Sequence, residues 1–274
     1  ANTTGNYNTA IGKDCLESNT TASENTAMGF NALAANTSGD ANVAIGVYAL
    51  DANTIGDRNV AVGHGALSTY NPSTNEDSYN TAIGYAALTN NTTANYNTAV
   101  GGLSMDSNTT GAGNVAVGED ALSGNTTGDD NVAVGQNALK SATTASSNTA
   151  VGQQAADAIT TGDLNVAMGK AALGANTVGD RNVAVGAYSL ATNNPSTNED
   201  SYNVAVGYNA SGSITTGVQN TSVGGLALDA LTTGDRNVAL GYASLSTATT
   251  ASDNTAVGNY AMVENTTGTN NTAV

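Results

Sequence analysis

The chain has 274 residues, of which 4% are aromatic and 10% are charged, with no Trp and one Phe. Because this composition cannot fill the core of an ordinary globular domain of that length, we expect a thin cross-section. Asp and Glu outnumber Lys and Arg 22 to 6, and the formal net charge of −16 argues against binding nucleic acid or an anionic membrane surface. No segment approaches the ~20 apolar residues of a membrane span, so insertion into a membrane is not expected.

An Asn followed by Thr or Val, a small residue and an aliphatic residue occurs sixteen times, with steps of 17 residues apart from two steps of 21. The Asn residues are Asn8, Asn25, Asn42, Asn59, Asn80, Asn97, Asn114, Asn131, Asn148, Asn165, Asn182, Asn203, Asn220, Asn237, Asn254 and Asn271. A short fixed period is typical of a solenoid, in which each coil buries its apolar side chains against its neighbours. We therefore predict an all-β, parallel β-solenoid (β-roll) of sixteen coils, continuous over residues 1–274 and part of a longer fibre.

One coil, numbered from its Asn, has the consensus N-[TV]-A-[VIM]-G-x-x-A-L-x-x-N-T-T-G-D-x. Its first four positions alternate with period two and are rich in β-branched residues, which predicts a short strand. Position four is apolar in all sixteen copies and position nine is Leu in eleven of fifteen, so we expect these rows to face each other across a narrow core. The Ala-Leu pair at positions eight and nine predicts a second strand. Each coil is thus expected to hold two short strands.

Two invariant positions have structural explanations. The Asn at position one is expected to form a ladder of side-chain amides between coils in register, and the Gly at position five to permit a tight bend. Position two is Val eight times and Thr eight times, so its face of the strand is expected to be partly dry and to lie near a second chain if the protein assembles. The ladder residues singled out are Asn42, Asn59, Asn114, Asn131, Gly46, Gly63, Gly118 and Gly135.

Both 21-residue steps contain the segment NPSTNEDSY, at 71–79 and at 194–202. The copies are 123 residues apart and neighbouring coils match at the same offset, which indicates duplication of a seven-coil block. Such insertions form loops on one face of a solenoid. Their carboxylates could coordinate Ca²⁺, yet no EF-hand or glycine-rich nonapeptide pattern accompanies them, so solvated acidic loops without a metal are favoured. These carboxylates belong to Glu76, Asp77, Glu199 and Asp200.

The sequence does not indicate an enzyme or a cofactor. His64 is the only His, which excludes a His cluster for zinc, and no Ser lies in a nucleophile-elbow motif. Cys15 is the only Cys and stands where most coils have Ala, so we expect a small buried side chain. Tyr residues beside the Gly bend are candidates for contact with a receptor, a glycan or another chain. They are Tyr48, Tyr85, Tyr188, Tyr208, Tyr242 and Tyr260.

The strings NTAIG at 8–12, NVAIG at 42–46 and NVAVG at 59–63 resemble the NSVAIG-type repeat of trimeric autotransporter adhesin heads (the YadA-like head). Similar arrays are typical of phage tail fibres and bacterial fibre proteins. The resemblance implies a left-handed parallel β-roll in which three chains pack side by side, and a role in attachment to surfaces or host cells. The repeat of that family is shorter, so the present coil carries additional turn residues.

From these features we expect a structural or adhesive segment of an extracellular fibre, at a cell surface or on a virion. Its expected partners are further copies of itself, as a homotrimer or an end-to-end fibre, and a host-surface protein or glycan. One alternative is a self-assembling filament without a receptor. Another is an ice-binding solenoid, but paired threonines such as Thr126-Thr127 are adjacent, and adjacent strand residues point to opposite faces, so they do not form a same-face array.

Overall fold

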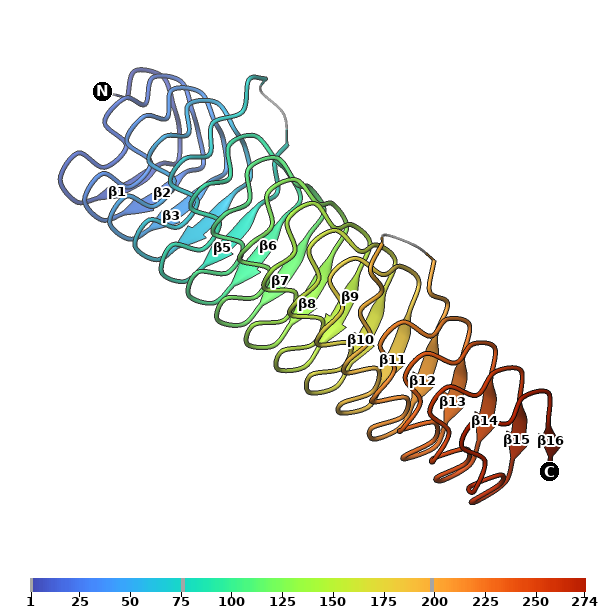
Figure 1. Ribbon diagram of the computed structural model, residues 1–274. Helices are drawn as coiled ribbons and strands as arrows, with labels where there is room; N and C mark the ends of the chain where they lie inside the picture. Colours follow the sequence, from blue (N-terminus) through green and yellow to red (C-terminus); the bar gives the residue numbers. More distant parts are fainter. Residues whose placement is uncertain (1, 75–76, 198–199) are drawn as a thin grey trace. The chain divides into compact units, whose positions relative to one another are not determined.

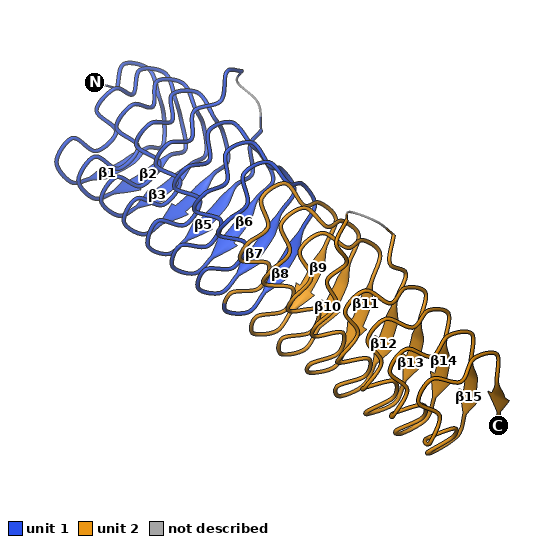
Figure 2. Ribbon diagram, in the orientation of Figure 1, with its two compact units in different colours: residues 1–136 blue, residues 137–274 orange. Residues whose placement is uncertain are grey.

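The computed structural model of the chain describes residues 2–74, 77–197 and 200–274. It is all-β, with sixteen strands and no helix among these residues (Figure 1). There is accordingly no helix in the described part that could cross a membrane. Two compact units, residues 1–136 and 137–274, are built from the same coil (Figure 2). Each unit is a parallel β-solenoid, which confirms the predicted fold class.

Each coil contributes one short strand. Within each unit this strand pairs with the strand of the next coil in parallel and in register, as in Val115↔Val132 and Val166↔Val183. In the first unit these are β1 (Thr9–Ile11), β2 (Thr26–Met28), β3 (Val43–Ile45), β4 (Val60–Val62), β5 (Thr81–Ile83), β6 (Thr98–Val100), β7 (Val115–Val117) and β8 (Val132–Val134). In the second unit they are β9 (Thr149–Val151), β10 (Val166–Met168), β11 (Val183–Val185), β12 (Val204–Val206), β13 (Thr221–Val223), β14 (Val238–Leu240), β15 (Thr255–Val257) and β16 (Thr272–Ala273).

The second strand predicted at positions eight and nine does not form, so the prediction of two strands per coil was wrong. In the coil that begins at Asn114, the backbone is left-handed at Asp120 (φ 54°), Leu122 (φ 53°) and Asp130 (φ 57°), and φ is 138° at Gly118. Equivalent residues repeat these values in the other coils. Left-handed residues bend the chain and cannot continue an extended ladder. Positions five, seven, nine and seventeen therefore close the coil.

The predicted partition of the core was also wrong. In β2 to β15 the buried residue is the small one at position three, which is Ala except for Ser222 in β13. Ala116 is fully buried, whereas Val117 at position four is 36% exposed. Ala121 and Leu122, from positions eight and nine, are fully buried on the opposite side of the coil. Period-two alternation puts positions two and four on one face, as expected, but that face points outward. Only the small Ala leaves room for Leu in so thin a coil.

Buried Asn side chains connect the coils at two positions, continuously at position one and, at position twelve, with interruptions by apolar residues such as Ile159 and Leu231. At position one, Asn114 Oδ1 accepts hydrogen bonds from the backbone N of Asn131 (2.9 Å) and from its Nδ2 (3.1 Å), and Asn114 Nδ2 donates to Gly128 O (2.8 Å). At position twelve, Asn125 Nδ2 donates to Asn108 Oδ1 (2.8 Å) and to Gly128 O (3.0 Å). The sequence had suggested only a turn at position twelve. Both rows bridge coils from inside and satisfy backbone groups that the short strands leave unpaired.

The insertions change what position twelve can contact. A regular Asn at this position bonds to the residue three places on, which the extra residues displace. In the first unit Tyr70 replaces the Asn and is fully buried, and its hydroxyl contacts Ser78 Oγ (2.6 Å) and Asn95 Oδ1 (2.7 Å). In the second unit Asn193 occupies the equivalent place, is 1% exposed, and has no hydrogen-bond partner for its Oδ1 or Nδ2 among the described residues.

This difference predicts that Asn193→Tyr stabilises the protein. The Tyr ring would occupy the place that Tyr70 fills and its hydroxyl could meet Ser201, the counterpart of Ser78. Removing an unsatisfied buried amide should raise the free energy of unfolding by about 1–2 kcal/mol. The reciprocal change, Tyr70→Asn, should lower it by a similar amount or more, because it also creates a cavity. Thermal unfolding of the two variants beside the unmodified chain provides the measurement, and a lower midpoint for Asn193→Tyr would contradict the explanation.

Candidate interaction surfaces

The outward side chains at positions two and four form two rows along the sheet of each unit, here called the outer face. These rows contain only Thr, Val, Ile, Met and Leu in all sixteen strands and therefore carry no charge. Apart from the terminal strands, position two is half-buried and position four is half-buried or exposed, with exposed fractions of 42% at Met28 and 40% at Val223. Side chains of the neighbouring coils cover the sides of each outward side chain, so mainly its apolar end is exposed to solvent.

An uncovered outer face is unusual for a parallel sheet. Parallel sheets are ordinarily covered on both sides, and contiguous exposed apolar patches mark interaction sites. Here the coil interior covers one side of the strands, through the buried row at position three, and no described residue of the same coil covers the other side. The outer face is thus a candidate surface for contact with another molecule.

A second candidate surface is a row of aromatic rings that follows the Gly bends of the first unit. Phe30 and Tyr48 are in edge contact with centroids 5.4 Å apart, Tyr48 and His64 are 6.2 Å apart at 78°, and His64 and Tyr85 are 5.7 Å apart at 28°. The Nζ of Lys13 lies 5.3 Å from the Phe30 centroid. Successive coils supply these rings from positions six and seven, which the bend directs outward.

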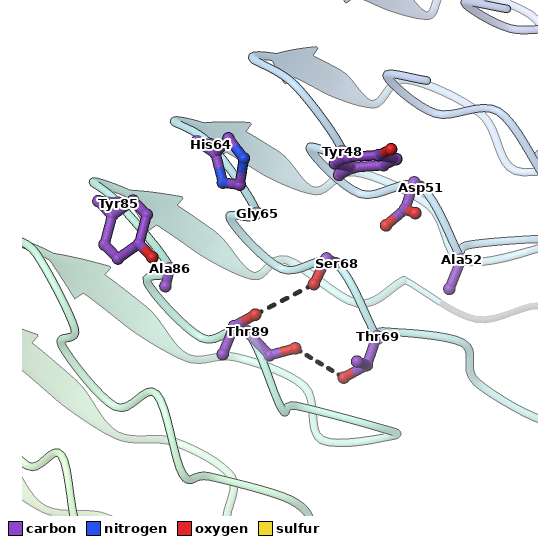
Figure 3. A pocket seen from close by; sticks show the side chains of 10 residues that line it. All are labelled: Tyr48, Asp51, Ala52, His64, Gly65, Ser68, Thr69, Tyr85, Ala86 and Thr89. Carbon is purple, nitrogen blue, oxygen red and sulfur yellow. Dashed lines mark hydrogen bonds between the residues drawn. The ribbon is translucent and has the colours of Figure 1, made fainter. Parts of the chain in front are cut away.

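Tyr48, His64 and Tyr85 border a pocket of about 550 Å³ (Figure 3). Its other lining residues come mainly from positions ten and eleven: Asp51, Ala52, Gly65, Ser68, Thr69, Ala86 and Thr89. Figure 3 shows the His64 and Tyr85 rings side by side and roughly face-on, with Tyr48 nearly edge-on beside Asp51. Two rings therefore form a shallow platform and the third forms a wall. We call this site the aromatic pocket.

The polar groups of the aromatic pocket are hydroxyls and one carboxylate. Thr69 Oγ1 donates to Thr89 O (2.7 Å), and the hydroxyls of Ser68 and Thr89 are 3.1 Å apart. Asp51 Oδ1 is buried and has no hydrogen-bond partner among the described residues. Burial raises the pKa of Asp51, opposed in part by backbone hydrogen bonds at Asp51 and Ala52. Oδ1 is therefore an unpartnered acceptor that is itself shielded from solvent, on a carboxylate that lines the pocket.

The structure places the six predicted Tyr contacts in three groups. Tyr48 and Tyr85 belong to the aromatic pocket, whereas Tyr188 with Tyr208 and Tyr242 with Tyr260 form separate edge-on pairs in the second unit. The sequence did not single out Asp51 or His64 as pocket residues. His64 had a usable signal, because it stands at position six like Tyr85 and can serve as a ring there. Asp51 had none, since position ten varies.

The acidic residues considered for Ca²⁺ do not form a metal site where the structure describes them. Glu76 and Glu199 lie outside the described residues. Asp77 forms an ion pair with Arg58 and accepts a hydrogen bond from Tyr79 Oη (3.2 Å). Asp200 has the same arrangement with Arg181 and Tyr202. In the described ranges no three His, Cys, Asp or Glu residues are grouped so as to hold a metal ion.

Several Asp carboxyl groups are partly buried, and burial raises their pKa values. This predicts an unusual dependence of stability on pH. Among the described residues, burial raises the pKa of five Asp side chains, whereas the hydrogen bond from Arg236 lowers the pKa of Asp253. At position sixteen, Asp57 Oδ1 accepts the Asp40 backbone N–H (2.7 Å), and Asp180 does the same for Asp163. The five residues are Asp51, Asp57, Asp157, Asp180 and Asp229.

A raised pKa means that the folded chain binds these protons more tightly than the unfolded chain. Stability should therefore increase as the pH falls from neutral through the raised values toward the ordinary Asp pKa of 3.8. Thermal midpoints across this range, in high salt to screen the net charge, provide the measurement. The double variant Asp57→Asn/Asp180→Asn keeps the acceptor oxygens and should flatten the dependence. An unchanged slope in that variant would assign the effect to other groups.

Comparison with protein-family models and with curated proteins finds no match to this chain. The resemblance to trimeric autotransporter adhesin heads consequently rests on the repeat strings.

Proposed function

We propose that this chain is a segment of an extracellular fibre that associates with further copies of itself through the outer face and presents its remaining surface for attachment. The observation that carries the proposal is the pair of uncharged, outward rows at positions two and four. The repeat resemblance supports the same role, because it implies side-by-side packing of three chains and attachment to surfaces or host cells.

Charge favours a second copy as the occupant of the outer face. The chain has a net charge of −16, yet the outer face carries none of it. Two copies can therefore meet there without bringing like charges directly together, while the acidic remainder disfavours contact elsewhere. The regular coil spacing adds to this, because the Val and Ile side chains of one copy repeat at the same interval as those of the next.

The residues of the outer face do not support the ice-binding alternative. Each strand presents one residue from the Thr/Val row and one aliphatic residue, so no strand carries two outward threonines. In the turns, the first of the paired threonines is also engaged, as in Thr109 Oγ1, which donates to Thr126 O (2.8 Å).

Light scattering after size-exclusion chromatography tests the proposal by measuring the mass in solution. A discrete trimer of the 26.9 kDa chain is the expected result. A mass that grows continuously with concentration would favour the filament without a receptor. A monomer at all concentrations would contradict self-association.

A further inference from the structure

The aromatic pocket has the chemistry of a binding site for a neutral carbohydrate, and the geometry points to a short uncharged oligosaccharide as its ligand. This inference rests on the proposed attachment role and names the class of ligand for it. The pocket belongs wholly to the first unit, between positions six and eleven of consecutive coils. It is therefore separate from the outer face, and self-association through that face leaves its residues unused.

The rings provide the apolar part of such a site. A sugar ring has a face of C–H groups that packs on an aromatic face, and the planes of His64 and Tyr85 differ by only 28° over 5.7 Å. Tyr48, at 78° to His64, closes one end. The Tyr85 side chain is 63% exposed, so its surface is available to a ligand. A volume of about 550 Å³ falls within the range of small-molecule sites.

The polar groups fit hydroxyls and disfavour anions. Asp51 lines the pocket with a carboxylate that can accept a sugar O–H, and Ser68, Thr69 and Thr89 add hydroxyls. The lining contains no Lys or Arg to balance a sialic acid, sulfate or phosphate group. With the carboxylate of Asp51 and a net charge of −16, an acidic ligand would meet repulsion.

The duplicated block shows that the coil itself does not require these side chains. At an offset of 123 residues, Ala171, Ala187, Gly174 and Ala191 stand in the places of Tyr48, His64, Asp51 and Ser68. Tyr85, Thr69 and Ala52 keep their identity, as Tyr208, Thr192 and Ala175. The same coil thus forms with or without the pocket, so packing within the solenoid does not account for the cluster.

The test is an array of neutral tri- to hexasaccharides built from glucose, galactose, mannose and N-acetylglucosamine, with sialylated and sulfated forms for comparison. The unmodified chain should bind at least one neutral oligosaccharide. Tyr85→Ala and Asp51→Asn should each weaken that binding roughly tenfold or more. Tyr208→Ala is the matched control, because Tyr208 is 62% exposed but lacks the surrounding cluster, and it should bind as the unmodified chain does.

Binding of no neutral oligosaccharide, binding of acidic forms alone, or an equal loss in Tyr85→Ala and Tyr208→Ala would overturn the inference. The solution mass of each variant separates this outcome from failure of the fibre proposal. A discrete assembly without sugar binding would remove the ligand assignment and leave self-association standing. A monomer that binds a neutral sugar through Tyr85 would contradict self-association and leave the ligand assignment standing.

Discussion

Replacing Gly118 with Ala is expected to lower the free energy of unfolding by about 3–5 kcal/mol. This Gly has φ 138°, a conformation that residues with a Cβ rarely adopt. An added Cβ would also lie 2.7 Å from the carbonyl C and O of Gly135 in the next coil. Since both atoms belong to the backbone of a stacked coil, neither can move without disturbing the register. Strain and steric overlap therefore act together at this position.

Gly102→Ala is the control for Gly118→Ala. Gly102 follows the bend Gly of the preceding coil, has no positive φ, and a Cβ there would meet no atom within 4 Å. Its substitution should change stability by less than about 1 kcal/mol. Urea unfolding followed by circular dichroism gives the comparison. Because stacked coils can unfold separately, proteolysis should also show cleavage near residue 118 in the Gly118→Ala variant alone. Similar midpoints for the two variants would contradict the strain argument.

Asn114→Ala should have the second largest effect, a loss of about 2–4 kcal/mol. The substitution removes the Oδ1 that accepts from two donors of Asn131 and the Nδ2 that donates to Gly128 O. These contacts are buried, so water cannot replace them without opening the coil. Urea unfolding and hydrogen exchange are the measurements, and the exchange of the Asn131 amide should accelerate most.

An exposed Asn serves as the reference for Asn114→Ala. Asn259 lies at position six and is exposed, so Asn259→Ala should change the unfolding midpoint little. If Asn114→Ala lowers stability as little as Asn259→Ala does, the buried side-chain amides at position one add no stability to that supplied by the backbone. The invariance of position one would then need another cause.

The periodic features of the chain were predictable because each repeats sixteen times. The 17-residue step, the parallel register and the strand at positions two to four all follow from one pattern. The repeat pattern did not predict which face of the strand points inward. Alternation groups Val115 with Val117 and separates both from Ala116, but it does not state which group is buried. Hydrophobicity predicted that the Val side chains are buried, whereas the narrow coil buries the smaller Ala side chains instead.

The left-handed positions were the second feature that the sequence concealed. Leu122 has φ 53° although Leu is not a residue that favours this region, and it does so because full burial of its side chain offsets the backbone cost. A propensity argument assigns an Ala-Leu pair to a strand or a helix. The aromatic pocket was concealed for a different reason, since Asp51 and Ser68 stand at position ten, where the consensus specifies no residue, and only stacking brings them together.

The central claim is that other copies of the chain cover the outer face, and thiol labelling tests it most directly. Val117 lies on the outer face and Val47 lies at position six outside it, and each is 36% exposed in the single chain. Each is changed to Cys in a Cys15→Ala background, and the rate of reaction with a maleimide is measured in the native state. The account predicts that the thiol at position 47 reacts at least tenfold faster than the thiol at position 117. Equal rates would show that the outer face is open to solvent and would contradict the claim.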